Sequence, residues 1–421
     1  MWVDDEHFDI AFHVRHIALP QPGTERELQA LVGRIFSERL DRSKPLWEIW
    51  VVEGLDGDRM AVVTKVHHCM IDGMAGVDLL KVALSPIPDA TVGDATPFVP
   101  RPAPDPAQLL RDEAIRRLRA PLEALSSVRS LVDGSKEASE DIQARIRAML
   151  TSARSGWFSN ASLTPLNDHI GPNRRFSWFT TPLDDVKEVK NQFGGTVNDV
   201  VIAAVAGGVR TYLQDDRGVD VGDLDFRAMV PVSIRGDIPA ATDGGNQVTM
   251  WLVDLPLAEP DPIERLRIVG AATRHLKETD QALGAAMLTQ SASWTPGTLL
   301  AAAARVAAQT ARPFNMTITN VPGPQIPLYL LESRMLANYP MVPLWVNHGV
   351  GVALFSYDGR MDWGIVADWD LVPDMGTVVD RIEGSVRELT TLARTRQRRR
   401  AAARKAAATR TANRARKAAT K

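Results

Sequence analysis

A run of prolines interrupts the regular structure of this chain and divides it into two parts. Seven prolines lie between positions 86 and 106: Pro86, Pro88, Pro97, Pro100, Pro102, Pro104 and Pro106. Each fixes its own φ and removes a backbone N–H donor, so neither a helix nor a sheet strand can run through the segment. We therefore expect a crossover or linker here. With 421 residues and a usual domain size of roughly 150, the chain has enough material for two or three domains.

Strand and helix patterns alternate on both sides of the prolines. Before them, 45–52 and 60–68 have the β-branched and aromatic residues of strands, and 72–84 has helical spacing. After them, we expect strands at 175–181, 226–231, 248–255, 315–320, 350–357 and 361–368 and helices at 184–193, 198–213 and 375–392. The sequence therefore predicts an α/β (α+β) fold.

Four segments follow from these patterns. They are an N-terminal domain with the proline-rich crossover (1–106), a helical connector (107–172), a C-terminal domain (173–393) and a basic tail (394–421) that we expect to be disordered. The tail has twelve Lys and Arg and no Asp or Glu, whereas the rest of the chain has 37 basic and 51 acidic residues. Such a tail suits anionic lipid headgroups; nucleic acid is the alternative, less in keeping with an acidic body.

Composition narrows the function classes further. The single cysteine, Cys69, excludes an intramolecular disulfide and a cysteine-based metal framework. No apolar run reaches the ~18 to 20 residues that cross a bilayer, and the acidic start, 1–8, is unlike a signal peptide. We therefore expect a cytoplasmic protein.

Two adjacent histidines are the main candidates for chemistry, in His67-His68-Cys69-Met70-Ile71-Asp72-Gly73. If 60–68 is a strand, His67 and His68 face opposite ways and only one can point into a given site. A neutral imidazole at a strand end is a suitable general base near neutral pH. Asp72 could orient it or form an ion pair, and Gly73 would permit a close turn.

The sequence gives less support to a metal site, a nucleophilic cysteine, a serine nucleophile or a nucleotide-binding loop. His67, His68 and Asp72 could hold a metal, but adjacent strand histidines diverge and no second cluster supports a site. We expect no metal. Cys69 could be a nucleophile beside His68, although a small buried filler is the simpler interpretation. The sequence contains no G-x-S-x-G elbow, no Walker A loop and no G-x-G-x-x-G after an expected strand.

The segment His67-His68-x-x-x-Asp72-Gly73 resembles the HHxxxDG signature of CoA-dependent acyltransferases, which include chloramphenicol acetyltransferase and peptide-synthetase condensation domains. Four further motifs occur in order and resemble the bacterial wax ester synthase/diacylglycerol acyltransferase family: Pro45-Leu46-Trp47, Thr196-Val197-Asn198-Asp199-Val200-Val201, Pro231-Val232-Ser233-Ile234-Arg235 and Asn315-x-x-x-Thr319-Asn320-Val321-Pro322-Gly323-Pro324. The resemblance spans roughly 1–392. The family's opening segment, expected before Trp2, is absent, so we expect part of the first domain to be missing.

The resemblance implies two chloramphenicol-acetyltransferase-like domains with an active-site channel between them. It also implies transfer of a long acyl group from acyl-CoA to a diacylglycerol, giving triacylglycerol, or to a fatty alcohol, giving a wax ester. Acyl-CoA would be a substrate, and no cofactor is expected. The enzyme would sit peripherally at the inner face of the cell membrane or on lipid inclusions. The alternatives are a condensation-type acyltransferase using carrier-protein thioesters and a catalytically weak lipid- or nucleic-acid-binding protein on the same scaffold.

Carried over by position, the resemblance makes His68 the general base, with His67 in the same catalytic segment and Asp72 and Gly73 serving its architecture. Asn198 is the candidate oxyanion donor, with helix capping beside Thr196 as the alternative. Arg235 is a candidate ion-pair partner for Asp72. The substrate channel is assigned to Pro45, Leu46, Trp47, Asp199, Asn320, Pro322 and Gly323, although the simpler interpretation of Pro45-Leu46-Trp47 is the start of a strand with its indole packed in the core.

Overall fold

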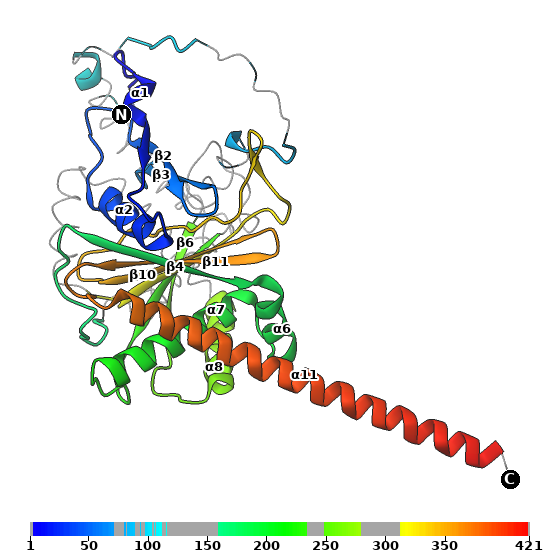
Figure 1. The fold of residues 1–421 in the computed structure, drawn as a ribbon. Coiled ribbons are helices and arrows are strands. Elements are labelled where there is room, and N and C mark those ends of the chain that lie inside the picture. Colours follow the sequence, from blue (N-terminus) through cyan, green and yellow to red (C-terminus); the bar gives the residue numbers. More distant parts are fainter. Residues whose placement is uncertain are drawn as a thin grey trace, which may run out of the picture.

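The structure is a computed structural model that describes residues 3–70, 80, 82–88, 93, 97–102, 105, 107–111, 115, 159–233, 248–278 and 312–419. The described residues form a three-stranded sheet, a six-stranded sheet and a short two-stranded ribbon, with helices against them (Figure 1). The predicted α/β class is confirmed.

The smaller sheet belongs to the first part of the chain and has the order β1-β2-β3. Its strands are β1 (Val14–Ala18), β2 (Trp47–Leu55) and β3 (Arg59–Val66), with α1 (Ile10–His13) before β1 and α2 (Glu25–Ser37) between β1 and β2. β1 pairs with β2 in parallel, and β2 pairs with β3 as an antiparallel hairpin. A capping box between Thr24 and Glu27 begins α2.

The larger sheet has the order β4-β11-β10-β7-β5-β6. Its strands are β4 (Arg174–Pro182), β5 (Arg227–Ser233), β6 (Val248–Asp254), β7 (Met316–Pro322), β10 (Val350–Tyr357) and β11 (Arg360–Asp368), and the ribbon is β8 (Tyr329–Leu330) with β9 (Ser333–Arg334). Each of the six long strands falls at a position that the sequence predicts, within two residues at either end.

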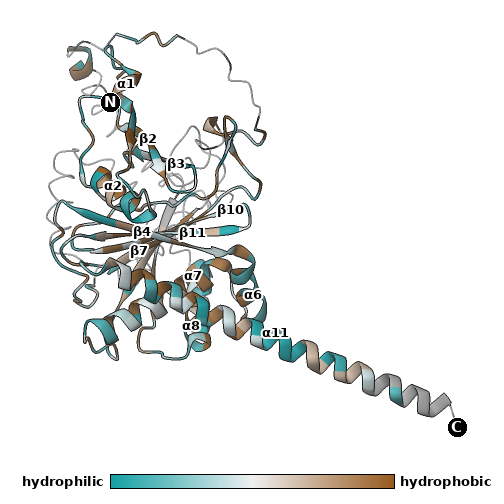
Figure 2. Cartoon of the chain, viewed as in Figure 1, coloured by the Kyte–Doolittle hydropathy of each residue, from teal (hydrophilic) through white to brown (hydrophobic). Residues whose placement is uncertain are grey.

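The two faces of the larger sheet are covered differently (Figure 1). One face carries α6 (Leu183–Phe193), α7 (Val197–Thr211), α8 (Pro262–Glu278) and α11 (Met375–Ala419), and a short π-helix, η1 (Tyr212–Asp216), follows α7. The main hydrophobic core lies between these helices and the sheet, where Val201, Ile202 and Val205 of α7 are fully buried. Hydropathy colouring shows the apolar residues gathered along the sheet and the helix faces against it (Figure 2).

The other face of the larger sheet holds the first domain in place. Leu28, Leu31 and Ile35 of α2 are buried in one cluster with Phe176 and Trp178 of β4. An amphipathic helix therefore joins the two sheets through a shared apolar layer.

Two predicted segments differ from the structure. In the expected helical connector (107–172), the described residues 107–111 and 115 are helical, whereas 159–172 is not. The segment 159–172 contains two Pro, two Asn and one Gly, and it lies against the start of β7, where Asn315 donates to the Ser162 carbonyl at 2.8 Å. The expected disordered tail is also wrong, because α11 continues to Ala419. Ala, Arg and Lys are strong helix formers, and neither Gly nor Pro follows Gly384. The distal part of α11 projects away from the body (Figure 1).

Two further findings concern the sequence predictions. The described residues between 86 and 105 form neither helix nor strand, as the prolines predict. Within the described part of the chain, no helix combines the length and apolar character needed to cross a bilayer. The expected helix at 72–84 falls mostly outside the described residues.

Candidate active site

An open cavity of about 3130 Å³ lies between the two sheets. Its walls come from α2, β2 and β3 on the first-domain side, and from the larger sheet, the start of α7 and the end of α8 on the other side. The segment 334–345 adds an apolar stretch that includes Met341, Leu344 and Trp345. This is the position that the resemblance gives to a channel between two domains.

Both histidines of the motif line this cavity. β3 ends at Val66, so the strand alternation that predicts opposite directions for the two side chains does not extend to them. Which of the two points into the site stays a prediction. The residues after Val66 form a turn in which Met70 N–H donates to the His67 carbonyl at 2.9 Å. Cys69 N–H donates to His67 Nδ1 at 3.2 Å, which fixes that ring. His68 is exposed to the cavity and has no hydrogen-bond partner in the described residues, so its imidazole is available to a substrate.

A buried lysine holds the strand that carries these histidines. Lys65 is 7% exposed, and its Nζ donates to the carbonyls of Ile35 and Glu38, both at 2.7 Å. Burial lowers the pKa of Lys65. The contact satisfies the last carbonyls of α2 and ties β3 to it. The sequence analysis did not identify Lys65, although its place on the inner face of the strand beside Val63 was a signal.

The other motif residues around the histidines are placed in part. Asp72, Gly73 and Arg235 lie outside the described residues, so their turn and their ion pair stay predictions. Cys69 is described and exposed, which does not fit a buried filler. Among the residues that the structure describes, no cluster of three or more His, Cys, Asp or Glu could hold a metal ion.

The start of α7 brings Asn198 and Asp199 to the opposite wall of the cavity. Thr196 is the N-cap: its Oγ1 accepts from Asp199 N–H at 3.1 Å, and its own N–H donates to Asp199 Oδ2 at 2.7 Å. Thr273 Oγ1 donates to Asp199 Oδ1 at 2.7 Å. Asp199 is thus occupied in holding α7 to α8, whereas the Asn198 side chain takes no part in the cap and stays available to a substrate.

The motif at the end of β7 contributes in two ways. Asn320 and Pro322 line the cavity, and Asn320 Oδ1 is a buried atom without a hydrogen-bond partner. Gly323 does not line it. A Cβ at Gly323 would lie 2.2 Å from Phe355 Cζ and 2.6 Å from the Ser356 carbonyl, so glycine allows the turn to pass close behind Phe355, which does form the wall.

The channel assignment of Pro45, Leu46 and Trp47 has no support from the lining of this cavity. None of the three lines the cavity. Trp47 stacks on His13 with ring centroids 4.5 Å apart, and His13 Nδ1–H donates to the Trp47 carbonyl at 2.7 Å. His13 is 1% exposed. The indole therefore packs at the start of β2, which is the alternative that the sequence analysis left open.

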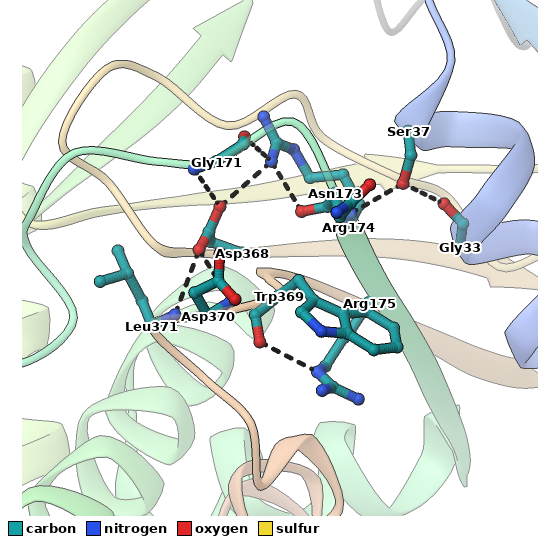
Figure 3. Close-up of polar contacts among 10 residues, drawn as sticks. All are labelled: Gly33, Ser37, Gly171, Asn173, Arg174, Arg175, Asp368, Trp369, Asp370 and Leu371. Carbon is teal, nitrogen blue, oxygen red and sulfur yellow. Dashed lines mark hydrogen bonds and ion pairs between the residues drawn. The ribbon is translucent and has the colours of Figure 1, made fainter.

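A polar contact joins the domains beside the cavity (Figure 3). Asp368, fully buried at the end of β11, accepts from Gly171 N–H at 2.8 Å, from Leu371 N–H at 3.1 Å and from Arg174 Nη1 at 3.2 Å. Arg174 N–H in turn donates to Ser37 Oγ of α2 at 2.8 Å. The buried carboxylate therefore fixes the start of β4, on which α2 ends.

Comparison with known proteins agrees with this architecture. The model of the wax ester synthase/diacylglycerol acyltransferase catalytic domain matches residues 1–201, and that of the WS/DGAT C-terminal domain matches residues 244–390. The chain belongs to the wax ester synthase/diacylglycerol acyltransferase family.

Relatives of known name cover most of the chain. A putative diacylglycerol O-acyltransferase of Mycobacterium tuberculosis is 35% identical over 92% of this chain and 76% of its own length. O-acyltransferase WSD of Acinetobacter baylyi is 30% identical over 91% of this chain and 82% of its own. The solved wax ester synthase/diacylglycerol acyltransferase from Marinobacter aquaeolei VT8 aligns with a TM-score of 0.66 and 26% identity, over 93% of this chain and 83% of that one.

The junction in Figure 3 gives a prediction of stability. Asp368→Asn should lower the free energy of unfolding by about 1 to 3 kcal/mol, because the carboxamide has one acceptor oxygen for donors that now share two. Urea denaturation followed by circular dichroism measures it. Asp370→Asn, on an exposed neighbour, is the control and should change stability by less than about 0.5 kcal/mol. Equal effects of the two variants would contradict the role given to Asp368.

Proposed function

We propose that this protein transfers a long acyl group from acyl-CoA to the hydroxyl group of a diacylglycerol, producing triacylglycerol, and that a fatty alcohol is its second acceptor, giving a wax ester. The family and the names of its relatives support this activity. The observation that carries it is the position of His68, exposed in a large inter-domain cavity whose walls are mostly apolar strands and segment 334–345. Such a cavity suits a long acyl chain.

The proposed reaction is a direct transfer. Neutral His68 takes the proton of the acceptor hydroxyl while the oxygen attacks the thioester carbonyl carbon. The Asn198 side-chain amide, on the opposite wall, donates to the oxyanion that forms. The carbon–sulfur bond then breaks, and the imidazolium returns the proton to the CoA thiolate. Acyl-CoA is consumed as a substrate, and no cofactor or metal enters these steps.

The association with a lipid surface is part of the same proposal. We place the protein at the inner face of the cell membrane or on lipid inclusions, where a diacylglycerol is found. The exposed end of α11 supports this position, because residues 394–421 hold twelve basic and no acidic residues. After Leu392 this helix has no large apolar residue, so it would bind anionic headgroups by charge and not by insertion.

Acyl transfer by the purified protein tests the activity. With radiolabelled palmitoyl-CoA, and with diacylglycerol and hexadecanol in separate reactions, we expect labelled triacylglycerol and a smaller amount of wax ester on thin-layer chromatography. His68→Gln should lower kcat by about 10² to 10⁴-fold, because the base is lost while the side-chain volume is kept.

Cys69→Ser is the matched control for that variant. It changes the exposed neighbour of His68 and should keep kcat, whereas a nucleophilic cysteine would lose it. Absence of product with either acceptor would contradict the proposed function, and full activity of His68→Gln would contradict the general base.

Removal of residues 401–421 tests the lipid surface. The deletion takes away seven basic residues and leaves the contact between Arg400 and Gln192 intact. Each basic residue near an anionic surface contributes roughly 1 kcal/mol, so sedimentation with phosphatidylglycerol vesicles should fall to the level seen with neutral phosphatidylcholine. Stability should not change. Vesicle binding equal to that of the full chain would show that α11 is not the attachment site.

A further inference from the structure

One wall of the cavity carries two cations on a helix that have no partners among the described residues. Arg274 and Lys277 lie one turn apart on α8, are exposed and line the cavity. Neither has an ion pair or a hydrogen bond within the described part of the chain. Thr273, the buried neighbour of Arg274, donates a hydrogen bond to Asp199 of α7. This contact fixes this end of α8 to the site.

Most of the other arginines that line the cavity or lie on α8 are already paired with a carboxylate. On α8 itself, Arg267 pairs with Glu264 at 2.6 Å, away from the cavity. Among the cations of the cavity, Arg174 pairs with Asp368, and Arg334 pairs with Asp358 at 2.6 Å. Two further cations of the lining without an ion pair, Arg39 and Arg42, lie on the first-domain side, in the loop after α2.

The α8 side also holds two buried polar atoms that lack partners. Trp251 Nε1 of β6 and Asn320 Oδ1 of β7 are buried without a hydrogen bond in the described structure, and both residues line the cavity. Trp251 packs against the same core as Leu276 of α8. Buried donors and acceptors are nearly always satisfied in folded proteins, because an unpaired one costs free energy. Both atoms are buried, so in this structure neither faces the cavity that their residues line.

We propose that Arg274 and Lys277, which we call the α8 wall, bind the phosphates of coenzyme A. This inference rests on the proposed function and adds the place of the acyl donor. Coenzyme A has phosphates at one end and amides along its pantetheine arm. The two cations bind the phosphates by charge-assisted hydrogen bonds.

The assignment separates the routes of the two substrates. A nucleotide on the α8 wall leaves the apolar stretch with Met341, Leu344 and Trp345 to an acceptor that has no charge. Because His68 and Asn198 lie on opposite walls of the same cavity, the thioester and the hydroxyl can meet between them.

The test compares donors with and without the nucleotide. Arg274→Gln/Lys277→Gln should raise KM for palmitoyl-CoA by about tenfold or more, as expected for the loss of charge-assisted contacts, and should leave KM for palmitoyl-pantetheine unchanged. Arg267→Gln, on the same helix but away from the cavity, is the matched control and should behave as wild type with both.

Calorimetric titration with free coenzyme A keeps the test independent of turnover. Wild type should bind it, and the double variant should bind it at least tenfold more weakly, with an unchanged circular dichroism spectrum and Tm. A double variant that binds coenzyme A as wild type does would overturn the inference, even if wild type transfers acyl groups. Weakened binding in an enzyme without transferase activity would uphold the α8 wall and reject the proposed function. Wild type that binds no coenzyme A would overturn both.

Discussion

The burial of α2 against the larger sheet is the interaction on which the site depends. Leu28, Leu31 and Ile35 pack on Phe176 and Trp178, and this apolar layer fixes the smaller sheet above one face of the larger one. Burying such side chains contributes about 1.5 to 3 kcal/mol each. Because the other face of the larger sheet is filled by α6, α7, α8 and α11, the cavity forms beside α2 and takes a wall from each domain.

Polar contacts make this docking specific. Ser37 Oγ at the end of α2 accepts a hydrogen bond from the Arg174 N–H, and the Arg174 guanidinium contacts the buried Asp368. Lys65 ties β3 to the last carbonyls of α2. Apolar packing alone would tolerate sliding of a helix over a sheet. The hydrogen bonds are satisfied in only one position of α2 on the sheet. That position sets where the turn with His67 and His68 lies relative to the start of α7.

Much of the fold could be predicted from the sequence, because its long strands are rich in β-branched or aromatic residues and α7 contains an apolar run from Val200 to Val209. α2 was missed although its capping box, Thr24 to Glu27, and the spacing of Leu28 and Leu31 are visible. The helical tail was missed because the high charge of 394–421 outweighed its helix-forming residues in the analysis. In the site, the motif predicted His67 and His68, but the turn that carries them needed the observed end of β3. Trp251, Asn320 and Arg274 are far apart in sequence, and only the strand order and the contact of α7 with α8 bring them to one cavity.

The central claim is that acyl transfer takes place in the cavity between the two domains, at His68. A crystal structure with a non-reactive thioether analogue of palmitoyl-CoA tests it most directly. The account predicts the analogue inside this cavity, with its sulfur beside the His68 imidazole and its acyl chain along the apolar strands of the walls. An analogue bound outside the cavity, or within it but with the sulfur remote from His68, would contradict the account.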